Sequence, residues 1–172
     1  APNLAPINGQ RFVEGRRVHH TDFGDGSHDE TAANPPFTEL AGMLGGHYVN
    51  RSCVACHDRN GRALPPAVGQ ELSSYVVHVG DASGAPHPQL GTVLQSRNTA
   101  GAPEALAVLG GWNNVQGLRE PVVQFLGVTP VHYSVRIAPQ LVGMGLLESI
   151  PEVAIEALAD PSDADGDGIS GK

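Results

Sequence analysis

The chain has 172 residues, which is enough for one domain with a real core. Hydrophobic residues make up 40% of it, so it is globular material and not a disordered tail, and the formal net charge is -8. No long basic run is present, which excludes the usual nucleic-acid binders, and no stretch approaches the roughly 20 apolar residues of a membrane span. We therefore expect one folded domain of 172 residues that neither binds nucleic acid nor spans a membrane.

The predicted elements are short, because 22 glycines and 14 prolines introduce many turns. Helices are expected over residues 10–20, 38–44, 140–148 and 151–159, with a single helical turn at 52–58. Runs rich in β-branched residues predict strands at 75–79, 122–128 and 131–137. Residues 21–36 are polar and turn-rich and are expected to form a loop. The expected fold class is mainly α, with long loops and a few short β-strands.

The most informative motif is Cys53-Val-Ala-Cys56-His57. On a helical turn, residues three and four apart share a face, so both thiols can reach one edge of a haem while His57 faces the iron. Cys-x-x-Cys-His is the attachment pattern of c-type haem. A thioredoxin-like thiol pair is the first alternative, but little strand is predicted ahead of Cys53. A zinc site is the second alternative, but the chain has only two cysteines and the motif lacks a second ligand pair.

Residues close to the motif are expected to assist it. The second ring nitrogen of His57 needs a backbone carbonyl, and the loop 61–68 is the expected source, with Pro65 or Pro66 preferred. Arg59 is a candidate partner for a haem propionate, because guanidinium matches a carboxylate bidentately, and a solvated surface arginine is the alternative.

Three longer segments resemble the bacterial di-haem oxidoreductases, also called thiol oxidoreductases, a family related to the di-haem cytochrome c peroxidases. They are YVNRSCVACHDRNGR at 48–62, RIAPQLVGMGLLESIPE at 136–152 and ADPSDADGDGISG at 159–171. The resemblance implies a cytochrome c-like haem domain, export to the periplasm or the extracellular space with removal of a signal peptide, and a second haem domain.

The sequence stops at Lys172 before any second Cys-x-x-Cys-His. We therefore expect the N-terminal haem domain of a longer di-haem, peroxidase-like oxidoreductase that continues past Lys172, with a redox protein or a second haem domain as its partner. The alternative is a mono-haem electron-transfer cytochrome c, complete in itself.

The sixth iron ligand separates these two functions, since a methionine or histidine closes the iron and an open iron binds peroxide. Met144, in an apolar segment, and His78, on a predicted strand, are the candidates. His19, His20 and His28 lie in polar surroundings and are expected to be exposed. At an open iron, the resemblance suggests Glu148 and Arg136 as acid-base residues.

An acidic stretch ends the chain. Asp163, Asp165 and Asp167 alternate ahead of Gly168, as in the first half of an EF-type calcium loop, and the carbonyl of Ile169 is a further candidate ligand. The final glutamate of that motif is absent, so a plain Asp/Gly turn is the alternative to Ca²⁺.

Overall fold

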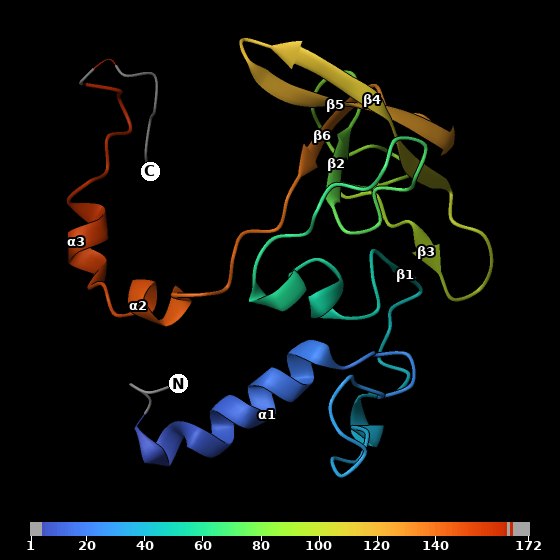
Figure 1. Cartoon of the computed structure of the whole chain (residues 1–172). Helices are drawn as coiled ribbons and strands as arrows, with labels where there is room; N and C mark the ends of the chain where they lie inside the picture. The colour runs from blue at the N-terminus through green and yellow to red at the C-terminus, as the bar shows by residue number, and fades with distance from the viewer. Residues whose placement is uncertain (1–4, 165, 167–172) are drawn as a thin grey trace. The chain divides into compact units, whose positions relative to one another are not determined.

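The computed structural model describes residues 5–164 and 166. It divides into two compact units, Ala1–Gln140 and Leu141–Lys172. The first unit contains helix α1 (Gly9–His20), the strands β1 (His47–Tyr48) to β6 (His132–Arg136), and a series of 3₁₀ turns (Figure 1). The second contains two short helices, α2 (Met144–Glu148) and α3 (Glu152–Glu156).

The expected mainly α fold is wrong, because the chain is only 21% helical and has 25% strand. The helices expected over 140–148 and 151–159 are shorter than predicted, Met144–Glu148 and Glu152–Glu156, and two further differences lie in the first unit. Strand β4 (Ala105–Val115) was not predicted, since its alanines, leucines and glycines lack the β-branched signal. The helix expected over 38–44 is a single 3₁₀ turn, Thr38–Leu40, because Gly42 has a φ of +75°, which no right-handed helix accommodates. Helix α1 and strands β2 (Val76–Gly80) and β6 confirm their predictions.

The strands form three antiparallel pairs. The largest is a long hairpin in which β4 pairs with β5 (Leu118–Gly127), and the others are β2 with β6 and β1 with β3 (Arg97–Asn98) (Figure 1). Gln116 and Gly117, with φ of 50° and 80°, form the two-residue loop of the hairpin. Positive φ at both positions is the signature of a type I′ turn, whose twist matches that of the paired strands.

The core of the first unit lies between these strands. Every second residue of β4, from Ala105 to Leu109, is buried, as expected of a strand with one face on a core. The buried apolar residues that form this core are Ala63, Leu72, Tyr75, Val77, Val79, Leu94, Ala105, Ala107 and Leu109. Three of the nine are alanines, so most of the buried apolar volume comes from the leucines, the valines and Tyr75.

Backbone hydrogen bonds attach the segment that follows the cysteine motif to this core. The amide of Leu72 donates to Ala107 O at 2.8 Å, and that of Gly69 donates to Leu109 O at 2.7 Å. Just ahead of the motif, Asn50 Nδ2 donates to Ser73 O at 2.7 Å. The motif is thus tied on both sides to residues at the edge of the strand core.

Candidate functional site: the Cys53–His57 turn

The motif adopts the predicted helical turn in a tighter form. Cys53–Ala55 is a 3₁₀ turn, and the amides of Cys56 and His57 both donate to Cys53 O, at 3.2 and 3.0 Å. Both cysteines are free thiols, Cys53 exposed and Cys56 half-buried. The turn therefore brings the two sulfurs and the imidazole of His57 onto one short, accessible piece of backbone.

His57 is oriented by a backbone carbonyl, but not by the expected one. Its Nδ1 lies 2.9 Å from Pro139 O, 82 residues away in sequence, and not at Pro65 or Pro66. The prediction that a backbone carbonyl orients His57 is confirmed, and the prediction that Pro65 or Pro66 supplies it is wrong. With Nδ1 donating, the lone pair is on Nε2, which makes no hydrogen bond to any residue that the structure describes.

The chain bends sharply after His57. Arg59 and Asn60 both have left-handed backbone, with φ of 51° and 60°, which costs a residue like arginine about 1–2 kcal/mol. Two hydrogen bonds hold the bend, from Asn60 N to His57 O at 3.0 Å and from Gly61 N to Asp58 O at 2.7 Å. The bend places Arg59 at a polar hollow that it shares with Val54, the residue between the cysteines. Arg59 thus lies beside the Cys53–His57 turn. Its contact with a haem propionate stays a prediction.

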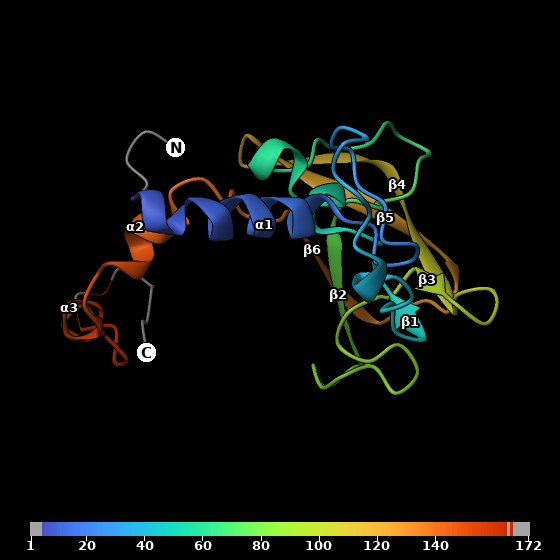
Figure 2. The ribbon, with the colours of Figure 1, turned by 90° about the horizontal axis from the view of Figure 1, so that it is seen from below.

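The C-terminal end of α1 lies against the Cys53–His57 turn, and the two are neighbours in both views of the ribbon (Figures 1 and 2). The ring centre of His19 is 6.3 Å from that of His57, with the ring planes at 56°. Burial, and then the neighbouring rings of His20 and His57, lower the pKa of His19. His19 and His20 are half-buried, so the prediction that they are exposed is wrong.

The shape of the turn bears on the thioredoxin alternative. Redox-active cysteine pairs of the thioredoxin type lie at the start of an α-helix, whereas Cys53–Ala55 is a single 3₁₀ turn, which disfavours that alternative. Burial raises the pKa of Cys56, and a hydrogen bond from the Asn50 side chain opposes this without reversing it.

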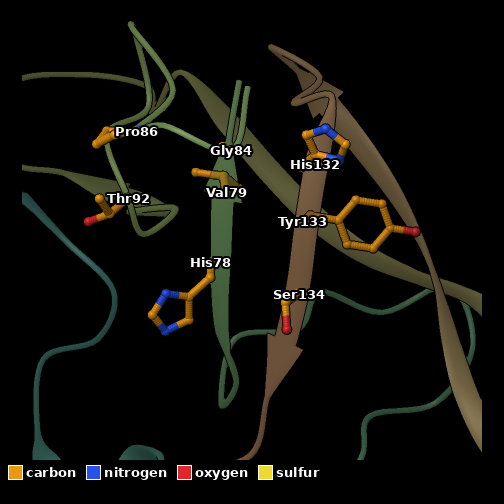
Figure 3. A pocket seen from close by; sticks show the side chains of 9 residues that line it. His78, Val79, Gly84, Pro86, Thr92, His132, Tyr133 and Ser134 are labelled. Carbon is orange, nitrogen blue, oxygen red and sulfur yellow. The ribbon is translucent and has the colours of Figure 1, made fainter. Parts of the chain in front are cut away.

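The predicted ligand His78 lies elsewhere in the first unit. It is exposed on β2 and lines a pocket with His132, Tyr133 and Ser134 of the neighbouring strand β6 (Figure 3). No residue of the Cys53–His57 turn lines that pocket. Arg136, at the end of the same strand, is exposed, and its Nε donates to Ser134 Oγ at 3.4 Å.

The remaining predicted residues are in the second unit. Met144 and Glu148 are the first and last residues of α2, and both are exposed. Asp163 is described, whereas the other proposed calcium ligands, Asp165, Asp167 and Ile169, lie outside the described residues. Within residues 5–164 and at 166, no group of three or more His, Cys, Asp or Glu side chains is arranged to hold a metal ion.

None of the helices in the described part of the chain has the length and apolar character needed to cross a membrane.

Comparison with known proteins identifies a family over the C-terminal part of the chain. Residues 119–172 match the model of the family described as "Di-haem oxidoreductase, putative peroxidase". The matched segment contains β6, α2 and α3 and excludes the Cys53–His57 motif, so the match and the motif are independent observations. Comparisons with curated proteins and with solved structures found no match. Over residues 119–172 the chain therefore matches the di-haem oxidoreductase family, which confirms the resemblance seen in its sequence.

Proposed function

We propose that the chain binds one haem c covalently through Cys53 and Cys56, with His57 as an axial ligand of the iron. The observation that carries this proposal is the 2.9 Å contact between His57 Nδ1 and Pro139 O. Histidines that bind metals almost always donate their second ring nitrogen to a carbonyl or carboxylate, which fixes the tautomer and leaves Nε2 for the metal. His57 is held in that state, one residue after Cys56.

The donor set of the turn fits a haem. Two thiols three residues apart, one exposed and one half-buried, are available for thioether bonds, and the imidazole beside them is oriented by the Pro139 carbonyl. A bound haem supplies one-electron redox chemistry. The protein's part would be to attach the haem, to fix the ring of His57, and to offer Arg59, two residues after His57, to a propionate.

We propose further that the domain transfers electrons within a di-haem oxidoreductase, with a second haem domain as its partner. The family match at residues 119–172 supports this over the mono-haem alternative. The proposed location is the periplasm or the extracellular space, and calcium at the acidic stretch stays part of the proposal.

Haem staining of a denaturing gel tests the attachment, because only covalently bound haem survives denaturation. We expect staining of the wild type after expression with a haem c maturation system, and none for Cys53→Ala with Cys56→Ala. Val54→Ala keeps both thiols and their spacing, so it should stain like the wild type. Haem that acid-acetone extracts from the wild-type protein would overturn the proposal.

A further inference from the structure

The burial of the two ring nitrogens of His19 is not explained by any hydrogen bond within the described part of the chain. Both Nδ1 and Nε2 are buried, and neither has a hydrogen-bond partner among the described residues. Leaving a polar atom buried and unpaired costs about 1–3 kcal/mol, so native structures rarely keep one without a reason. A neutral imidazole placed in this way has a nitrogen lone pair that is available to a metal ion.

The candidate metal ion is the one that His57 is proposed to bind. The two ring centres are 6.3 Å apart. Two imidazoles that bind one metal from opposite sides, at a metal–nitrogen distance of about 2.0 Å, have ring centres about 6 Å apart. Because His57 Nδ1 is already engaged with Pro139 O, its Nε2 is the nitrogen left for such a metal.

The protein holds His19 in this position by polar contacts on both sides of it. Thr21, fully buried, donates from Oγ1 to Arg17 O at 2.8 Å and so closes the last turn of α1. Arg51 Nε donates to Asp22 Oδ1 at 2.9 Å, and Arg51 O accepts from Phe23 N at 2.9 Å. Since Arg51 is two residues ahead of Cys53, these bonds join the end of α1 directly to the attachment turn.

We propose that His19 is the sixth ligand of the haem iron, opposite His57. The proposal rests on the covalent haem proposed above. It assigns a closed, six-coordinate iron to this domain, so that its haem carries electrons and does not bind peroxide. Neither Met144 nor His78 is then needed as a ligand, and the acid-base role considered for Arg136 and Glu148 does not apply to this haem.

Electron paramagnetic resonance and absorption spectra of the haem-loaded full chain test this assignment. The wild-type ferric protein should be low-spin, and His19→Ala should become high-spin and return to low-spin on addition of imidazole. His19→Met should stay six-coordinate and show the weak far-red band of sulfur ligation. His20→Ala, a matched change at the next residue of the same helix, should keep the wild-type spectrum.

Three outcomes would overturn this assignment. A high-spin wild type, or a low-spin His19→Ala without added imidazole, would overturn the ligation. The same would follow if His20→Ala became high-spin to the same extent as His19→Ala. Haem staining of the denatured variants separates these results from failure of the proposed function, because loss of His19 ligation leaves the thioether bonds intact.

Discussion

Truncation of Leu109 tests whether the strand core supports the haem site. Leu109 is 0% exposed, and its backbone also accepts the hydrogen bond from Gly69 that ties the loop after the motif to β4. Removing a buried leucine side chain typically costs 2–5 kcal/mol, and the buried neighbours of Leu109 on β4, Ala105 and Ala107, are too small to fill the cavity. We expect Leu109→Ala to lower the free energy of unfolding by about 3 kcal/mol, which corresponds to roughly 6–12 °C in Tm.

Denaturant unfolding gives the measurement. Trp112, the only tryptophan, lies three residues further along β4 and reports on the strands, while the haem absorbance reports on His57. The two transitions should coincide and shift together in Leu109→Ala, as expected of one cooperative unit. Leu118→Ala, at the hairpin tip where the leucine is 74% exposed, should change stability by less than about 0.5 kcal/mol. Equal losses in the two variants, or haem and tryptophan transitions that separate, would refute the reasoning.

Two further predictions concern the hairpin and the thiols. Gly127 has a φ of +95°, and a Cβ there would collide with the Glu104 carbonyl, so Gly127→Ala should cost about 2 kcal/mol or more in the same unfolding assay. Gly101→Ala, in open space, should be close to neutral, and a neutral Gly127→Ala would contradict the described turn. In haem-free protein, burial raises the pKa of Cys56, so less of it is thiolate near neutral pH. Its alkylation rate in Cys53→Ser should therefore reach half-maximum above the usual thiol pKa of about 8.5, and a midpoint below that value would contradict the described burial of this thiol.

The predictable parts of this protein are those encoded locally. The spacing of Cys53, Cys56 and His57 lies within one turn, and the structure forms that turn. Strands β2 and β6 have β-branched residues and were predicted, whereas β4 was not, because Ala105 and Ala107 fit its buried face by their small size alone.

The remaining features depend on contacts between distant segments. The burial of the His19 nitrogens arises where the end of α1 meets a turn more than 30 residues later, and no pattern around His19 signals it. The partner of His57 is a backbone carbonyl, which every residue possesses, so residue type could not identify Pro139.

Under the proposed haem attachment, that carbonyl also implies an order of events in the maturation of the protein. The two thiols are neighbours in any conformation of the chain, so attachment would not require a folded segment. The bond from His57 to Pro139 closes an excursion of 82 residues that includes all of β2 to β6, and the entropy of closing it is recovered only when those strands pair. Attachment would therefore depend on the local spacing of the thiols alone, whereas the orientation of His57 would depend on the folding of the strand core.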